Sequence, residues 1–414
     1  MNKNFLALGL AAALLAPQVA GAEGFAINEW SAEGVAMGGA RMFAEDDAAN
    51  VAYNPASITK VKGEVMKSSY TYLSPHGNYK LYDSNNDEIK GEPTHNKVHA
   101  GWAVGSYYVR QINDKEWFGI GAFPRFAMVS EFERASKAST NAFFSKLNGV
   151  SVTPTYAHKF DKKWSAAVGA EINYVGLELQ KNLVIPTAGV NGTTQIEGES
   201  YALGWNAAAN YAFDDKNEIG VVYRSRIKHS LEADLKGYGT KSPASPLVGS
   251  NDVFGNAYGV VTLPDSWDIG YNHKFDKKTR LELKATRTNW STYDALNVYF
   301  DKSLVGIPGI AESSPSAKNW SNGWRYAIGL EHNFSDKYAA MAGFAFDESS
   351  IPHDGGDFMV PTGLRRTYSI GARYNDKKQT VAVALGWMDV GNLDFAGHAT
   401  DAYCLLYTSP SPRD

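Results

Sequence analysis

The chain has 414 residues and a formal net charge of −4, so its composition excludes the strongly basic surface typical of a nucleic-acid-binding protein. Aromatic residues make up 13% of the chain and 39 residues are glycine, which favours a β-rich protein with many turns. No apolar run reaches the roughly 18 residues from which a membrane-spanning helix is inferred.

The first 22 residues have the three parts of a secretory signal peptide. Lys3 supplies the positive start, Phe5–Ala16 the apolar run, and Ala20–Ala22 a cleavage site of small residues. No cysteine follows that site, which argues against a lipoprotein. We therefore expect an exported chain that begins at Glu23.

The next segment, Glu23–Gly63, has little strand character. Its centre, Glu45–Thr59, is rich in Asp, Asn and Ala and contains an Asn-Pro turn signal. Phe25, Ile27 and Trp30 give the segment an apolar start. A wide barrel leaves an aqueous hole unless something fills it. We therefore predict that this segment is a plug, or hatch, inside the lumen; an N-terminal surface loop is the alternative.

A short polar turn recurs six times after the hatch. The copies are Ile112–Lys115, Phe160–Lys163, Phe213–Lys216, Phe275–Lys278, Phe334–Lys337 and Tyr374–Lys378. Segments of about ten residues with alternating polarity follow them, such as Trp164–Tyr174 and Gln379–Met388, as in membrane β-strands. Longer connections, among them Leu183–Ser200 and Asp234–Gly259, join the other strand ends. Short turns at one rim and long loops at the other predict an outer-membrane barrel, with a soluble β-sandwich as the alternative.

The six turns imply twelve strands from Gly101 to Trp387, and Glu64–Leu73 adds one more. Single-chain bacterial barrels have even strand numbers. We therefore predict an all-β, 14-stranded antiparallel transmembrane barrel over residues 64–403, with the last strand missing from this chain. Residues 404–414 resemble a translated sequencing adapter and are expected to be a non-native tail.

Strand alternation directs several basic side chains into the lumen, namely Arg224, Arg226, Lys228, Arg280, Lys284 and Arg325. One interpretation is a cationic interior that holds a ligand carboxylate by charge-assisted hydrogen bonds. The other is a network of ion pairs that only braces the wall, with Glu171, Glu282 and Glu331 as partners.

The chain resembles the FadL-type long-chain fatty-acid transporters of Gram-negative outer membranes over most of Glu23–Phe395. The matching motifs are, in order, Gly24–Trp30, Asp46–Val51, Asn54–Ala56, Gly204–Asn206, Tyr223–Ser225, Leu263–Trp267 and Phe344–Pro352. The fold of that family, a fourteen-stranded barrel with an N-terminal hatch, agrees with the strand count. The resemblance implies a monomer among outer-membrane lipids and lipopolysaccharide, without a cofactor or a metal.

The mechanism that the resemblance implies is passive uptake of a long-chain fatty acid or another apolar hydrocarbon. Substrate is caught among extracellular loops, binds above the hatch, and leaves sideways through a gap at the third strand, here Trp117–Phe132. Pro124 cannot donate to the strand ladder, so a break at this point is reasonable. The implied lateral gate is Pro124, Phe126 and Ala127, although Ala127 stands where the family often has glycine. The loop Leu183–Ser200 is short for the family, which leaves the substrate open.

The ligand-binding residues that we expect are Phe25, Asn54, Pro55, Ala56, Lys181, Arg224, Lys318 and Arg325. Lys181 matches a basic pocket residue of the family, and Lys318 lies about two positions from a second one. An ordinary rim lysine is the alternative for both.

Two other functions compete with transport: an outer-membrane lipid-modifying enzyme and a general diffusion porin. No Gly-x-Ser-x-Gly motif or metal-ligand spacing is present, and the nine histidines are scattered, so we expect no catalytic residue. A porin would conduct small ions with the hatch in place.

Overall fold

In the computed structural model, the described residues are 24–83, 87–91, 95–96, 100–136, 139, 142–185, 190–239, 253–301, 313–352, 360, 363–376, 379–391, 393–394 and 404–408. The predicted signal peptide and parts of the long connections lie outside these ranges.

The segment before the first strand folds into three short helices, α2 (Ala32–Ala36), α3 (Asn50–Tyr53) and the 3₁₀ helix η1 (Pro55–Lys60). The Ser31 hydroxyl caps α2 by accepting the N–H of Gly34, and the Asn54 side chain caps η1 by accepting the N–H of Ala56. Among the described helices, none combines the length and apolar character needed to cross a bilayer.

One antiparallel sheet forms the wall. Its strands are β1 (Glu64–Leu73), β4 (Gly101–Gln111), β5 (Glu116–Glu131), β6 (Phe144–Lys159), β7 (Trp164–Ile185), β8 (Val190–Ala212), β9 (Asn217–Arg224), β10 (Ile227–Gly239), β11 (Val253–Leu263), β12 (Ser266–Lys274), β13 (Thr279–Thr288), β14 (Ala295–Phe300), β15 (Ser313–Ala317), β16 (Gly323–Asn333), β17 (Tyr338–Asp347), β18 (Arg365–Asn375) and β19 (Thr380–Val390). The prediction of an all-β antiparallel barrel is confirmed.

Four crossings of the wall consist of two strand segments each: β9 with β10, β11 with β12, β13 with β14, and β15 with β16. The described strands therefore trace thirteen crossings, which is consistent with the number expected for this chain. A fourteenth strand stays a prediction. A separate small sheet joins β2 (Gly77–Tyr82), β3 (His95–Asn96), β20 (Leu393–Asp394) and β21 (Cys404–Thr408), so part of the expected tail pairs with β2.

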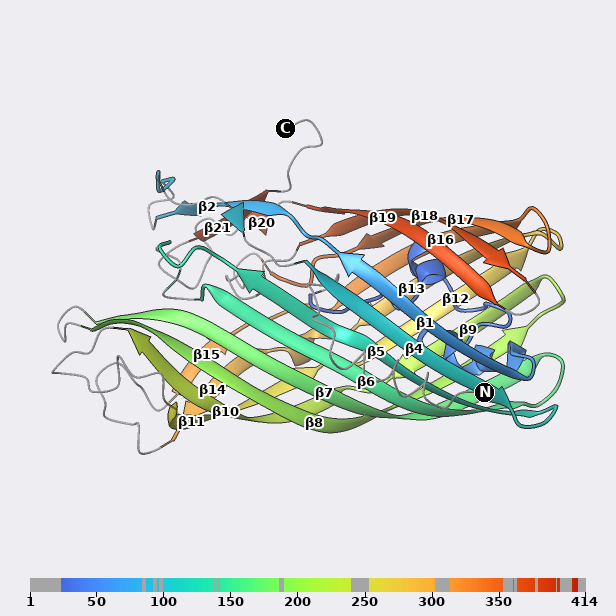
Figure 1. Cartoon of the computed structure of the whole chain (residues 1–414), viewed down its shortest axis with the longest axis horizontal. Helices are drawn as coiled ribbons and strands as arrows, with labels where there is room; N and C mark the ends of the chain where they lie inside the picture. Colours follow the sequence, from blue (N-terminus) through green and yellow to red (C-terminus); the bar gives the residue numbers. More distant parts are fainter. Residues whose placement is uncertain are drawn as a thin grey trace.

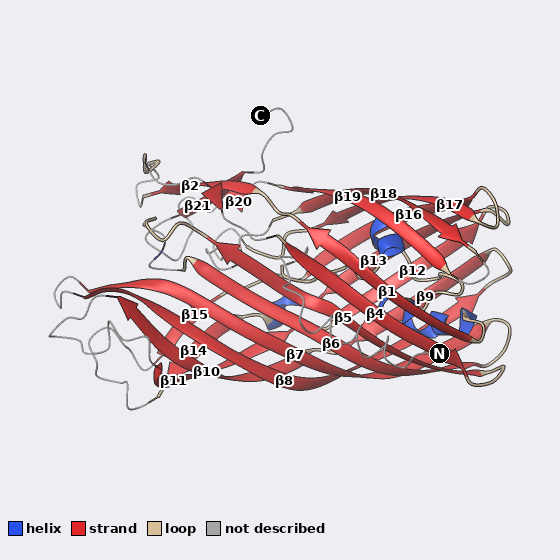
Figure 2. Cartoon of the chain, viewed as in Figure 1, coloured by secondary structure: helices blue, strands red, loops and turns tan. Residues whose placement is uncertain are grey.

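The strands run obliquely along a long cylinder, and the short helices lie within its outline (Figures 1 and 2). Helix α2 contacts β1, β17, β18 and β19, whereas η1 contacts β5 to β8. These strands stand on different sides of the barrel. The segment Gly24–Gly63, which we call the hatch segment, therefore lies in the lumen between them.

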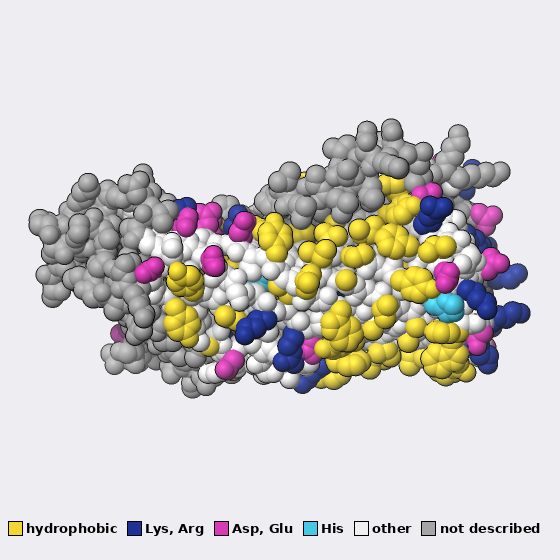
Figure 3. Space-filling model, turned by 90° about the horizontal axis from the view of Figure 1, so that it is seen from below, with side chains coloured by type: hydrophobic (Ala, Val, Ile, Leu, Met, Phe, Trp, Pro, Cys, Tyr) yellow, Lys and Arg dark blue, Asp and Glu magenta, His cyan; other side chains and the backbone are white. Residues whose placement is uncertain are grey.

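The face drawn in Figure 3 carries a broad band of hydrophobic side chains, with charged side chains of both signs at the short-turn end and further charged side chains beyond the other edge of the band. On β8, for example, Leu203 is 77% exposed, while the neighbouring inward residue Asn206 is buried. Val383 and Leu385 of β19 are exposed as the sequence pattern predicts. An apolar band above a charged rim is the surface of a transmembrane barrel.

The inward and outward faces exchange between β9 and β10. Arg224 is buried, but Arg226 is 61% exposed and Lys228 is also exposed, so the prediction that both point inward is wrong. Ser225 and Arg226 interrupt the strand, and this shifts the alternation by one residue. Ile227 and His229 consequently face the lumen.

The prediction that Leu183–Ser200 is a long loop is also wrong, because β7 continues to Ile185 and β8 begins at Val190. The outer parts of Asp234–Gly259 are likewise strand, and residues 240–252 lie outside the described ranges. Glu197, Glu199, Glu232 and Asp234 of these extensions are exposed, so polar side chains stand where the membrane strands have apolar ones. The alternation that marks a membrane strand is therefore weak there.

Candidate functional site

Phe25 is the centre of an aromatic cluster above the hatch helices. Its ring centroid lies 4.7 Å from that of Trp290, 5.4 Å from Tyr293, 5.9 Å from Trp320 and 6.0 Å from Phe126. Phe25 itself is a hatch residue and 1% exposed, and its four partners come from β5 and from the segments between strands. We call these five residues the aromatic cluster.

Apolar wall residues extend the aromatic cluster into a larger core, among them Met128, Leu147, Val175, Leu177, Ile227, Leu231, Val261, Leu263, Leu296 and Val298. Several of them face inward only because of the exchange of faces after β9. Lys318 is buried two residues before Trp320, and its N–H donates to the Asp294 carbonyl at 2.7 Å. We call this apolar core the chamber; its side chains are packed together, and their composition suits an amphipathic or wholly apolar ligand.

The third crossing, β5, separates from β4 halfway along its length. The β4 pairing ends at Ala122, opposite Ser106, whereas the β6 pairing continues to Glu131. The register of β5 with β6 shifts between Pro124 and Phe126, which marks a β-bulge. One edge of β5 beyond Ala122 is therefore available to another partner.

The start of the hatch segment pairs with that edge of β5. The Ile27 N–H donates to the Arg125 carbonyl at 2.8 Å, and the Ala127 N–H donates to the Phe25 carbonyl at 2.9 Å. The indole N–H of Trp30 also donates to the Pro124 carbonyl at 2.6 Å. The predicted gate positions are thus the place where hatch and wall meet.

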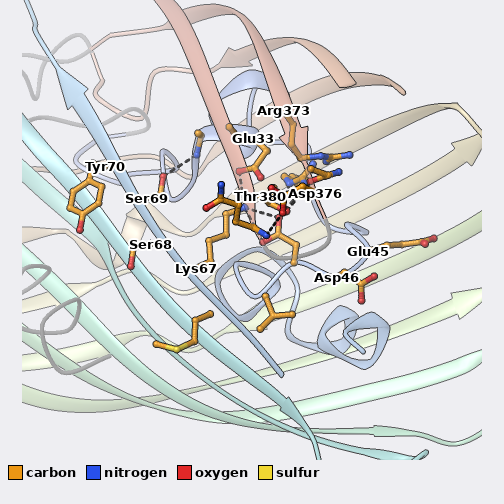
Figure 4. A pocket seen from close by; sticks show the side chains of 18 of the residues that line it. Glu33, Glu45, Asp46, Lys67, Ser68, Ser69, Tyr70, Arg373, Asp376 and Thr380 are labelled. Carbon is orange, nitrogen blue, oxygen red and sulfur yellow. Dashed lines mark hydrogen bonds and ion pairs between the residues drawn. The ribbon is translucent and has the colours of Figure 1, made fainter. Parts of the chain in front are cut away.

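A buried ionic network ties the hatch to the opposite wall (Figure 4). Lys67 of β1 pairs with Glu33 at 2.7 Å and with Asp47 at 2.9 Å, while Arg41 pairs with Asp47 at 3.0 Å and with Glu331 at 3.1 Å. Burial alone would raise the pKa of the Asp47 carboxyl, but Lys67 and Arg41 outweigh it and hold this pKa well below its ordinary value of 3.8. A cavity of about 890 Å³ adjoins the network between β1 and β19, apart from the aromatic cluster.

Arg224 and Arg325 are both committed to the hatch. Arg224 donates to the Ala52 carbonyl and pairs with Asp268 at 2.7 Å; Arg325 donates to the Gly38 carbonyl at 2.8 Å. These two arginines therefore form part of a bracing network, as the second interpretation predicts. The network braces the hatch as well as the wall. Of the three proposed glutamate partners, Glu331 pairs with Arg41, Glu282 accepts the Met42 N–H, and Glu171 pairs with Arg125.

The remaining expected residues lie elsewhere. Asn54 donates to the Asn210 side chain at 2.7 Å, and the Ala56 carbonyl accepts the Ser165 hydroxyl at 3.3 Å. Asn54, Pro55 and Ala56 are buried against the wall and are not part of the aromatic cluster. Lys181 is half-buried on β7, four residues beyond Leu177 on the same face, which places it about 13 Å along the strand.

Sequence reasoning did not find Trp290, Tyr293 and Trp320, which lie between strand segments. A signal was present: both tryptophans stand in an Asn-Trp-Ser tripeptide, at 289–291 and 319–321. Both tryptophans pack against Phe25.

An antiparallel barrel with a lipid-facing apolar band, whose lumen holds its own N-terminal segment below an apolar chamber, belongs to the class of outer-membrane transport barrels. The family model of the outer membrane protein transport proteins (OMPP1/FadL/TodX) matches residues 13–400. The chain belongs to this family, whose members are transporters in the outer membrane of Gram-negative bacteria.

Individual relatives agree with this assignment. The long-chain fatty acid transport protein of Escherichia coli K12 is 23% identical, and the match covers 92% of this chain and 91% of that protein. Outer membrane protein P1 of Haemophilus influenzae is also 23% identical, covering 90% and 86%. In fold, the chain is similar to a Pseudomonas aeruginosa FadL homologue (TM-score 0.77, 16% identity, 93% and 96% covered) and to the Pseudomonas putida toluene transporter TodX (0.66, 16%, 93% and 96%).

Proposed function

We propose that this protein imports long-chain fatty acids or other apolar hydrocarbons by passive diffusion. The substrate enters at the extracellular end, binds in the aromatic cluster above the hatch, and leaves sideways beside β5. One observation carries the proposal: Phe25 is the centre of the aromatic cluster, and its carbonyl is also bonded to the free edge of β5 at Ala127. Ligand binding and wall opening therefore involve the same hatch residue.

The choice between acid and hydrocarbon depends on the lysines. Lys318 lies at the edge of the aromatic cluster and suits a carboxylate, and Lys181 suits an earlier contact nearer the extracellular end. The relative from Escherichia coli is named for fatty acids, whereas TodX is named for toluene. The buried Lys318 favours an acid as the substrate of this chain.

A porin and an enzyme fit the geometry less well. The hatch segment is buried and contacts the wall on several sides of the lumen, so that packed side chains occupy the centre of the barrel. We further propose a monomer that contacts outer-membrane lipids and lipopolysaccharide and that works without catalysis, cofactor or metal.

Uptake into proteoliposomes tests the proposal. Purified protein in proteoliposomes should carry oleate into the vesicle interior, where the oleate is retained. The same protein in planar bilayers should show almost no ion conductance while the hatch is intact. Toluene uptake without oleate uptake would change the substrate class. High conductance would support the porin, and steady hydrolysis of an ester substrate would support the enzyme.

A further inference from the structure

The bulge in β5 contains an arginine that makes two different contacts. Arg125 is only 4% exposed, and it lies at the register shift between Pro124 and Phe126. Its carbonyl accepts the Ile27 N–H at 2.8 Å, and its guanidinium donates to the two carboxylate oxygens of Glu171 at 2.9 and 2.8 Å. One residue therefore binds the hatch with its backbone and the wall with its side chain.

A chain of buried side chains holds Glu171 in place. The Ser151 hydroxyl donates to Glu171 at 2.6 Å, the Asn173 amide donates to Ser151 at 2.8 Å, and the His229 Nε2 lies 2.9 Å from the Asn173 Oδ1. All four residues are fully buried and come from β6, β7 and β10. Such a connected network fixes the carboxylate, and with it the guanidinium, in one geometry.

The same guanidinium also contacts the ligand chamber. It lies over the Phe126 ring, 4.9 Å from its centroid, and Phe126 belongs to the aromatic cluster. A ligand that displaces Phe25 disturbs the ring contact between Phe25 and Phe126, and a ligand that displaces Phe126 moves that residue itself. Either movement acts on a residue that adjoins Arg125.

We propose that Arg125 is a positioning residue that couples the ligand chamber to the wall. Its ion pair with Glu171 holds the bulge in the form that bridges to Phe25 and Ile27, and the first hatch residues leave β5 only when this arrangement gives way. The proposal rests on the proposed function in one respect, that release of this bridge opens the exit for the ligand.

The bridge can be measured directly with a pair of cysteines. Ala26 and Phe126 are directly opposite in an isolated antiparallel bridge, flanked by the two hatch–β5 hydrogen bonds. Residues in this kind of pair have Cα atoms about 4.5 Å apart, which a disulfide can span. The parent for all measurements is Ala26→Cys with Phe126→Cys in a Cys404→Ser background. Its rate of disulfide formation under mild oxidant reports how much of the bridge is formed.

We expect Arg125→Gln and Glu171→Gln to slow disulfide formation by up to about tenfold, because each removes a buried charge-assisted contact worth about that factor in the bridge equilibrium and the rate follows the fraction of molecules in which the bridge is formed. Arg125→Lys, which keeps the charge, should lie between the Gln variants and the parent. Arg366→Gln is the control, since Arg366 pairs with Asp389 at 3.3 Å on the exposed wall; its rate should equal that of the parent.

Equal rates in the parent and both Gln variants would overturn the coupling. If the Gln variants do not insert as folded barrels, Arg125→Lys and Glu171→Asp are measured in their place. Disulfide formation at the rate of the parent in both of these variants would also overturn the coupling. The cross-linking needs no substrate. A failure of oleate uptake therefore contradicts the proposed function while leaving the coupling intact, and the reverse also holds.

Discussion

At the scale of single residues, we propose that Lys318 decides which end of the ligand the chamber recognises. Replacing it by Met keeps most of the volume and removes the charge. We expect the dissociation constant for oleate to rise about ten- to a hundredfold, the range for a buried charge-assisted hydrogen bond. The affinity for toluene should not change. Fluorescence displacement with both ligands measures this, with Lys181→Met as the comparison, and an unchanged oleate affinity in Lys318→Met would remove the carboxylate assignment.

Asp47 pairs with Arg41 inside the hatch segment and with Lys67 of β1, so its charge contributes to holding the hatch to the wall. Its pKa is lower in the folded hatch than in an opened one, so its stabilisation is complete above about pH 4 and is lost as the pH falls toward the lowered value. We expect Asp47→Asn to lower the free energy of hatch opening by about 2–4 kcal/mol at neutral pH, since it breaks a buried ion pair.

Hydrogen exchange of the Ala49 amide, which donates to Asp47 at 2.9 Å, reports this opening. The wild type should lose protection in acid, and Asp47→Asn, which already lacks this ion pair, should lose less protection over the same pH range. The idea fails if both proteins lose protection in parallel as the pH falls.

At the scale of elements, the exchange of faces between β9 and β10 decides which residues line the chamber. Leu231 is buried and inward, and its neighbour Ser230 is exposed. We expect Leu231→Asp to abolish oleate binding, because a carboxylate would then lie unpaired in an apolar core. Ser230→Asp, its matched control, should bind as the wild type does. Binding assays on the two variants would contradict the structure if the effects were reversed.

The crossing formed by β9 and β10 shows which features of the fold can be predicted from the sequence alone and which cannot. Period-two alternation and six similar turns are local signals, and they predict the strands of the membrane band, the turns at one rim and the barrel. The interruption at Ser225 and Arg226 has no such local signal, because its effect is a shift of register that depends on how β10 pairs with β8 and β11. The inward positions of β10 could therefore not be predicted by extending β9.

Only those features of the candidate site that have local signals could be predicted from the sequence. Phe25 and the β5 break at Pro124 have signals in the sequence, and the structure places them together. Trp290 and Trp320 come from different connections, and only long-range packing brings them to Phe25. Arg224 and Arg325 point inward as predicted, but their partners in the hatch follow from three-dimensional contacts that no spacing in the sequence encodes.

At the scale of the whole molecule, the hatch is attached to the wall on several sides. The ionic network holds it to β1 and β16, Arg224 holds it to β9, and the backbone bridge holds it to β5. Two of the described attachments adjoin the aromatic cluster: the bridge to β5, and the Arg365 guanidinium of β18, which donates to the Gly24 carbonyl at 3.3 Å. A molecule built in this way can release one contact beside its ligand while the others keep the lumen closed to water and ions.

The disulfide between Ala26→Cys and Phe126→Cys tests this central claim most directly, because it locks the hatch to β5 and leaves the ionic network and the Arg224 contact in place. The oxidised form is compared with the reduced form of the same variant, since both lack the Phe126 ring. Oleate uptake into proteoliposomes should stop in the oxidised protein and return after reduction of the same sample, while oleate still binds in both forms. Uptake that continues at an equal rate in the oxidised protein would show that substrate does not leave beside β5, and would contradict the account.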